Sequence, residues 1–124
     1  MAELAQIKAE KRVMLTQRIH KIHQLSIQAN GAGIAHCFTN ICGHVDTFEA
    51  YVQPTDQTYL EGVPQIYLSR VSVRLSPYDW EDLPSVEDWF ATEVAKLNQH
   101  IDYLESILAA GEPVLCQEEV GGAA

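Results

Sequence analysis

The sequence predicts an α+β fold, in which a small antiparallel sheet is flanked by a long N-terminal helix and a long C-terminal helix. Three observations support this: a helical segment without Gly or Pro over residues 2–28, β-prone runs between residues 34 and 75, and a second helical pattern that stops at Gly111. We expect residues 1–116 to form a single α+β domain and residues 117–124 a flexible tail. We also expect the domain to form a dimer or higher oligomer.

The first helix is expected over residues 2–28. Its apolar residues recur about every 3.5 positions; they are Leu4, Ile7, Met14, Leu15, Ile22 and Leu25. Lys11 and Arg18 interrupt this stripe, and the sequence Asn30-Gly31-Ala32-Gly33 ends the helix, because Gly readily adopts the positive φ of a C-cap. A stripe this narrow covers its own domain only in part, so the helix is able to serve a subunit contact.

Three β-prone segments follow, over residues 34–41, 44–52 and 65–75. The third is the clearest, because its side chains alternate between two faces. One face is expected to carry Arg70, Ser72 and Arg74, and the other Tyr67, Val71, Val73 and Leu75. An antiparallel sheet of at least three strands is the consequence.

The second helix is expected to start at Ser85, with Asp88 completing a capping box, and to run to Ala110. Its predicted core stripe consists of Val86, Phe90, Val94, Leu97, Ile101, Leu104 and Leu108. A flanking stripe beside it consists of Trp89, Lys96, His100, Tyr103 and Ile107. Together these stripes are wider than one sheet needs.

Charge excludes several classes of function. The chain has 8 basic and 17 acidic residues, a net charge of −9, which argues against binding to duplex nucleic acid or to an anionic membrane. Most basic residues lie near the N-terminus and most acidic ones near the C-terminus, so the two segments are expected to attract each other. We find no membrane span and no signal peptide, and three cysteines suit a reducing cytoplasm.

No catalytic or metal site is expected. His36, Cys37, Cys42 and His44 lie close in sequence, but on a strand neighbouring side chains point to opposite faces, which does not suit tetrahedral zinc. The chain has no nucleophile elbow, no papain-like cysteine and no phosphate-binding glycine loop. We therefore predict a protein that is not an enzyme and that uses no cofactor and no metal.

The most informative polar feature is the pair Arg70 and Arg74. Side chains four apart on a strand share a face, about 13 Å from each other. Guanidinium groups suit phosphate or carboxylate, so the pair is a candidate anion site. The alternative is a solvated face on which these arginines pair with Asp46 or Glu49. Among the aromatic residues Trp89, on the flank of the helix, is the preferred stacking candidate, whereas Phe90 is expected in the core.

The sequence Gly43-His44-Val45-Asp46, followed by an alternating strand, resembles small phage proteins of the anti-Thoeris sponge family. The order of elements is similar too. The resemblance implies a phage anti-defence protein that sequesters a cyclic nucleotide immune signal without cleaving it. The signal would be a cyclic ADP-ribose isomer or a cyclic oligonucleotide, in the cytoplasm of an infected bacterium. It further implies a homo-oligomer with its pockets near subunit boundaries.

On this hypothesis six residues bind the ligand. Arg70 and Arg74 contact phosphate, and Arg18 reaches in from a partner helix. His44 and Asn98 hydrogen-bond ribose or base, and Trp89 stacks on the ligand or braces the pocket.

Two alternatives stay open. The first is an acidic inhibitor that binds a host defence protein through a continuous acidic surface made of Asp79, Glu81, Asp82, Glu87 and Asp88. The second is a structural or assembly protein of a virion, which would form a large ring-like oligomer and bind no small molecule.

Overall fold

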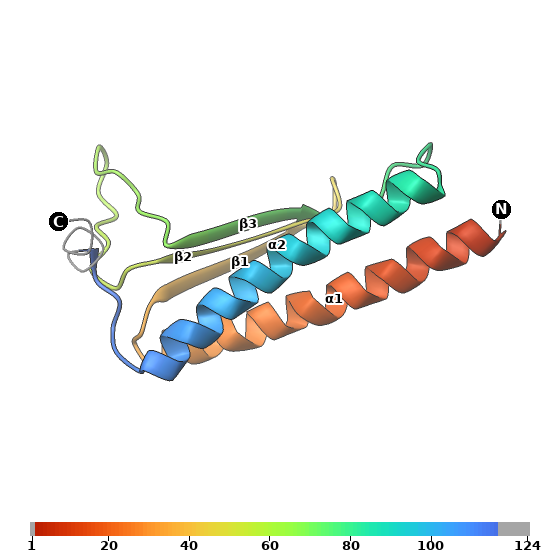
Figure 1. The fold of residues 1–124 in the computed structure, drawn as a ribbon. Coiled ribbons are helices and arrows are strands. Elements are labelled where there is room, and N and C mark those ends of the chain that lie inside the picture. Colours follow the sequence, from red (N-terminus) through yellow and green to blue (C-terminus); the bar gives the residue numbers. More distant parts are fainter. Residues whose placement is uncertain (1, 117–124) are drawn as a thin grey trace.

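Two long helices cover one face of a three-stranded antiparallel sheet (Figure 1). The computed structural model describes residues 2–116, and the tail expected at residues 117–124 lies outside this range. The elements are, in order, α1 (Ala2–Gly31), β1 (His36–Cys42), β2 (Thr47–Gln53), β3 (Ser69–Arg74) and α2 (Leu83–Ala110). The strand order is β1-β2-β3, so the α+β class and the flanking helices are confirmed. We call the sheet face away from the helices the open face.

Helix α1 ends at Gly31, within the glycine-containing segment that was predicted to stop it, and three residues beyond the expected end at residue 28. Gly33 has a φ of 70°, which a side-chain-bearing residue adopts only at a cost. The last turn also places Asn30 beside β1. Its Nδ2 donates to the Cys37 carbonyl oxygen over 3.0 Å, and its Oδ1 accepts from the Cys37 amide over 2.7 Å. Asn30 therefore ties the end of α1 to the start of β1.

The alternation predicted for the third strand is confirmed within β3. Val71 and Val73 are buried beneath the helices, whereas the Arg70 and Ser72 side chains are exposed on the open face. Tyr67 was expected beside Val71, and this is wrong. Because β3 begins only at Ser69, the alternation does not extend to Tyr67, which contacts residues of the open face instead.

Helix α2 begins two residues before the position predicted from the sequence. Asp82 is the N-cap, and its carboxylate accepts from the Ser85 backbone amide over 3.0 Å. Pro84 occupies the first turn, where its missing amide costs nothing. The prediction that Ser85 starts the helix is therefore wrong.

The buried face of α2 is rotated from the predicted stripe by about one residue. The buried residues recur with a period near 3.5; they are Val86, Trp89, Glu93, Leu97, His100, Leu104 and Ile107. Glu93 and His100 tolerate burial because each has a hydrogen-bond partner on β3. Trp89, expected on an accessible flank, is only 4% exposed, and Phe90, expected in the core, is half-buried.

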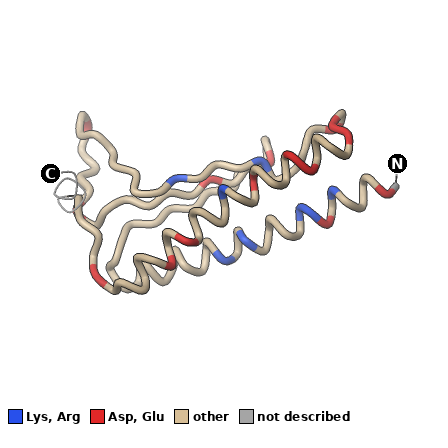
Figure 2. Tube along the Cα trace, viewed as in Figure 1, with Lys and Arg blue, Asp and Glu red and all other residues tan. Residues whose placement is uncertain are grey.

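The basic residues of α1 lie beside α2, whose N-terminal end is acidic (Figure 2). Lys21 and Glu105 approach to 4.0 Å between the two helices, and both side chains are about half exposed. Such a pair contributes little to stability on its own. Apolar contact between the helices, through residues such as Leu15, Leu97 and Leu104, is the main force that holds them. No helix in residues 2–116 is both long and apolar enough to cross a membrane.

Candidate ligand-binding face

The strand register places side chains of the open face in rows across the sheet. Phe38 lies opposite Tyr51, and Tyr51 lies opposite Arg70, so these three residues form one row. In the direction of the β1–β2 turn, the next row contains Asn40, Glu49 and Ser72, and the row after it Cys42, Thr47 and Arg74. The open face is thus aromatic over one half and polar or charged over the other.

The aromatic half is a set of rings in mutual contact. Phe38 and Tyr51 stack with their centroids 4.8 Å apart and their planes 16° from parallel. Tyr67 meets Tyr51 edge-on at 5.3 Å. Tyr59, from the loop of residues 54–68, meets Phe38 edge-on at 6.4 Å. We call these four residues the aromatic face; Phe38, Tyr59 and Tyr67 remain exposed, so their rings are accessible to a ligand.

The 54–68 loop is fixed against one end of the open face by a chain of hydrogen bonds. The Tyr59 hydroxyl donates to Gln53 Oε1 over 3.1 Å, and the His36 Nδ1 lies 3.0 Å from the same hydroxyl. Gln53 Nε2 donates onward to Gln65 Oε1 over 3.0 Å. Partial burial raises the pKa of the Tyr59 hydroxyl above its usual range. The loop therefore holds Tyr59 at the margin of the aromatic face in its protonated form.

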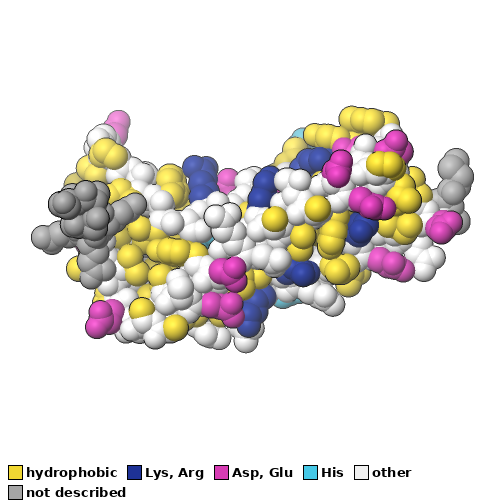
Figure 3. Space-filling model, viewed as in Figure 1, with side chains coloured by type: hydrophobic (Ala, Val, Ile, Leu, Met, Phe, Trp, Pro, Cys, Tyr) yellow, Lys and Arg dark blue, Asp and Glu magenta, His cyan; other side chains and the backbone are white. Residues whose placement is uncertain are grey.

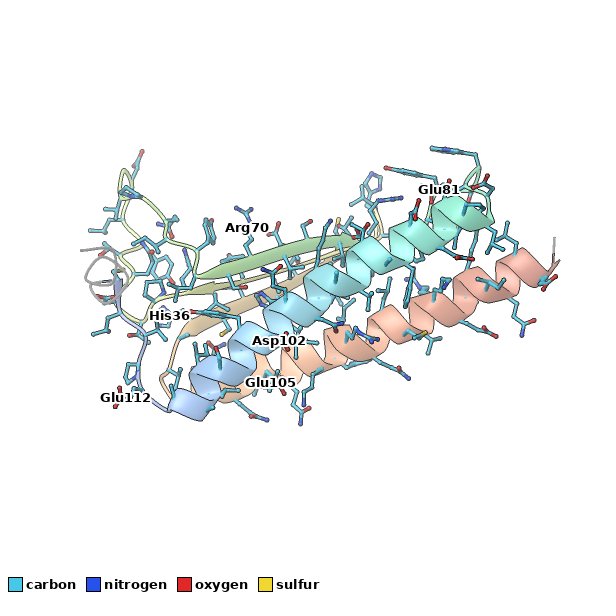
Figure 4. All side chains as sticks on the ribbon, in the orientation of Figure 1. His36, Arg70, Glu81, Asp102, Glu105 and Glu112 are labelled. Atoms are coloured by element: carbon cyan, nitrogen blue, oxygen red, sulfur yellow. The ribbon has the colours of Figure 1, made fainter. Side chains whose placement is uncertain are left out.

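Arg70 supplies a cation next to these rings. Its Cζ lies 4.6 Å from the centroid of the Tyr67 ring, and its guanidinium approaches Glu49 to 3.7 Å. The side chain is 53% exposed and projects away from the helices (Figure 4). The pairing with Glu49 that the sequence left open is thus present, whereas Asp46 binds Arg12 of α1. Since an exposed pair is weak, Arg70 is able to exchange Glu49 for an anionic ligand.

Arg74 lies on the same face but in a different setting. Its guanidinium lies 4.2 Å from the centroid of the Tyr78 ring and approaches Glu81 to 3.7 Å. Tyr78 in turn stacks on Trp80 at 4.6 Å with nearly parallel planes. Because Arg74 Nη1 is buried and the Arg74 side chain is 33% exposed against 53% for Arg70, this arginine is less available to a ligand than Arg70.

The other predicted site residues lie elsewhere. Arg18 Nε donates to Asn98 Oδ1 over 2.9 Å, so these two meet each other in the helix layer, away from the open face. His44 is an exposed residue of the turn between β1 and β2. Trp89 is buried, and its Nε1 donates to the Arg74 carbonyl oxygen over 3.2 Å. Its predicted stacking role as an accessible ring is therefore corrected: it supports Arg74 from the core side.

Sequence reasoning missed the four aromatic residues. Phe38 and Tyr51 lie in predicted strands, but only the pairing register shows that they are neighbours. Tyr59 and Tyr67 lie outside the strands, in residues 54–68. A partial signal existed, since five of the chain's eight Phe and Tyr residues fall between positions 38 and 67. They are these four and Phe48, which lies in the core.

The cysteines carry no metal site among the residues that the structure describes, where no group of three or more His, Cys, Asp or Glu side chains could hold an ion. Burial raises the pKa of the Cys37 thiol to about 11, so it stays protonated and unreactive at neutral pH.

Comparison with protein-family models, with curated proteins and with solved structures finds no match to this chain.

Proposed function

We propose that this protein binds a cyclic nucleotide on its open face and sequesters it without cleaving it. The ligand would be a cyclic ADP-ribose isomer or a cyclic oligonucleotide. The observation that carries the proposal is the juxtaposition of the aromatic face with Arg70. In the setting that goes with this proposal, a phage protein acts in the cytoplasm of an infected bacterium and removes an immune signal.

The chemistry of the two halves fits such a ligand. A nucleobase stacks on an exposed aromatic ring with about 1–3 kcal/mol per base. The Phe38, Tyr59 and Tyr67 rings are exposed within one cluster that a base is able to contact. Arg70, at the edge of this cluster, offers two parallel N–H groups to a phosphate. A protein of negative net charge still binds an anion at a site where several of its cationic side chains lie close together.

A second copy of the chain completes the site in this proposal. The aromatic face contacts a stacked base on one side only, so the opposite side of the bound base would remain in water. Tight sequestration needs a more enclosed, pre-organised site. A partner subunit that faces the sheet covers the solvent side of the bound base, in keeping with the homo-oligomer expected from the sequence.

The first test is a thermal-shift screen against cyclic ADP-ribose isomers and cyclic di- and trinucleotides. A ligand at about 100 times its Kd adds about 2.7 kcal/mol to the free energy of unfolding, which raises the Tm of a domain this size by several degrees. The proposal expects a rise selective for one compound, and recovery of that compound intact after heating. A flat response across the panel, or a cleaved ligand, contradicts it.

Substitutions on the open face locate the site. We expect Arg70→Ala and Tyr51→Leu each to weaken binding of the selected compound about tenfold or more, which corresponds to about 1.4 kcal/mol. Lys21→Ala is the matched control, because it removes an exposed cation from the helix layer. Isothermal titration calorimetry measures all four proteins. Equal affinity in Arg70→Ala and the wild type would move the site away from the open face.

One observation favours a second candidate, an acidic inhibitor of a host protein. Trp80 is 78% exposed and lies beside Asp79 and Asp82, and Figure 3 shows hydrophobic side chains next to acidic ones at this end of the molecule. Exposed tryptophans with a charged rim are typical of binding hot spots. Two of the five expected acidic residues already have structural roles, since Glu81 pairs with Arg74 and Asp82 caps α2. A host protein that binds the wild type at low salt and not Trp80→Ala would favour this function.

A further inference from the structure

The free edge of β3 presents backbone groups to a groove beside α2. Strand β3 is an edge strand, and the Leu75 amide donates to the Asp46 carbonyl oxygen at its end. In an antiparallel pair hydrogen-bonded residues alternate, so residues 71 and 73 face β2 with their amides. The amides and carbonyls of Arg70, Ser72 and Arg74 therefore point outward, along the free edge.

Helix α2 satisfies this edge at one end only. Glu93 Oε2 accepts from the Arg74 amide over 2.8 Å, and Trp89 Nε1 donates to the Arg74 carbonyl oxygen. Lys96 Nζ lies 3.5 Å from the Ser72 carbonyl oxygen. Among the described residues, the outward amides of Arg70 and Ser72 and the Arg70 carbonyl have no such partner. Edge groups of this kind form a template for another strand.

The uncovered part of the edge borders a cavity of about 400 Å³ between β3 and α2. Its lining residues are Leu68, Ser69, Arg70, Val71, Ser72, Lys96, Gln99 and His100. His100 is 2% exposed, and its Nδ1 lies 2.8 Å from the Ser69 hydroxyl oxygen. Its Nε2 is buried without a hydrogen-bond partner. A buried polar atom without a partner is costly, so a ligand that reaches it gains a hydrogen bond.

We infer that this groove binds an extended, acidic peptide segment of a partner protein, which adds a fourth strand beside β3. The peptide backbone would pair with the Arg70 and Ser72 amides and with the Arg70 carbonyl. The edge of β3 from Ser69 to Ser72 fits a segment of about four residues at ~3.3 Å per residue. This inference does not rest on the proposed function, which concerns the open face; the two share only the Arg70 side chain.

Charge and side-chain direction favour an acidic segment. Lys96 and Arg70 lie on the two sides of the edge, each now paired with a glutamate, Glu93 or Glu49. Successive side chains of an added strand would point alternately toward α2 and toward the open face. An acidic side chain on the first side meets Lys96, and one on the second meets Arg70. A side-chain oxygen directed toward α2 would also suit His100 Nε2.

The test starts from a phage-displayed library of random 12-residue peptides selected on the wild-type protein. The affinity of the best selected peptide is then measured by fluorescence polarisation on the wild type, Ser72→Pro and Ser72→Ala. Proline removes the outward amide of Ser72 without removing a bond to β2, and edge strands tolerate it. Ser72→Ala is the matched control, because it keeps the amide and removes only the hydroxyl.

We expect selected peptides to be acidic and to bind Ser72→Pro at least tenfold more weakly, with Ser72→Ala within about threefold of the wild type. Failure to select any peptide, or equal binding by folded Ser72→Pro, overturns the inference. If Ser72→Pro does not fold, hydrogen exchange of the wild type decides, since the peptide must slow exchange at the Arg70 and Ser72 amides. If the peptide leaves amide exchange at Arg70 and Ser72 unchanged, the inference is overturned. It is also overturned if, without peptide, exchange at these amides slows as the protein concentration rises, because a second copy of the chain would then occupy this edge.

Discussion

The Asp46 carboxylate connects the β1–β2 turn to α1 and to the segment that follows β3. Asp46 lies in the turn between β1 and β2 with a φ of 52°, a left-handed conformation that Asp and Asn tolerate better than most residues. The Arg12 guanidinium of α1 and the Ser76 hydroxyl both donate to it. The hydrogen bond from Arg12 is the main cause that holds the pKa of Asp46 below its usual range.

We expect Asp46→Asn to lower the free energy of unfolding by about 1 kcal/mol at neutral pH, because it removes a charged hydrogen bond while keeping the turn. Partial exposure of both side chains keeps the loss at this modest size. Since the folded-state pKa is lowered, the stabilisation is present above the unfolded pKa, near 4, and is lost as the pH falls through the folded value. Urea denaturation at several pH values measures it. Asp102→Asn, an exposed substitution on α2, is the control, and a loss of equal size there would refute the assignment to Asp46.

His100 gives the protein a second pH dependence, in a different range. Burial lowers the pKa of His100 to about 4, from an ordinary value of 6.5. The unfolded chain therefore takes up a proton first as the pH falls. Stability due to neutral His100 is complete above about 6.5 and is lost as the pH falls toward 4, with a slope of at most ~1.4 kcal/mol per pH unit. We expect His100→Gln to flatten the unfolding free energy across this range. A slope identical to that of the wild type would show that His100 titrates normally in the fold.

At the scale of the element, the start of α2 offers a sharp comparison. Asp82 accepts from the Ser85 amide, whereas no cap role is left for the Ser85 side chain. We expect Asp82→Ala to lower the unfolding free energy more than Ser85→Ala does, because it removes the side-chain acceptor of the cap. Ser85→Ala should change it by less than ~0.5 kcal/mol, as for an ordinary exposed position. Thermal or urea denaturation of both variants measures the two changes in unfolding free energy. A larger loss in Ser85→Ala than in Asp82→Ala would show that Ser85 is the N-cap.

Sequence patterns predicted the existence and type of every element but not all of their faces. The period of α1 and the glycines after it located its end, and the alternation in β3 placed Val71 and Val73 inside. The predicted stripe on α2 correctly contained the buried residues Val86, Leu97 and Leu104. It was rotated by about one residue because hydrophobicity alone favours Phe90 and Val94 over Glu93 and His100. These polar residues are buried because β3 happens to present hydrogen-bond partners to them. Tertiary packing determines which partners lie opposite a helix residue, so the sequence of the helix alone does not predict them.

At the scale of the whole molecule, the decisive feature is that residues 2–116 cover the sheet on one side only. The arginine pair was predicted to share a face, and Arg70 and Arg74 do share it. The aromatic face could not be predicted, because Phe38, Tyr51 and Tyr67 meet only through strand register and loop path. Arg18 and Asn98, both far from Arg70 in sequence, were grouped with it by residue type, yet they pair with each other in the helix layer.

The measurement that tests the account most directly is a two-dimensional amide NMR titration with the compound selected in the thermal-shift screen. The account predicts that the perturbed amides belong to β1, β2 and β3 near Phe38, Tyr51 and Arg70, and to the 54–68 loop. Amides of α1 around Arg18 should remain unchanged. Perturbations confined to the helix layer, or to residues 78–88 at the acidic end, would contradict a binding site on the open face of the sheet.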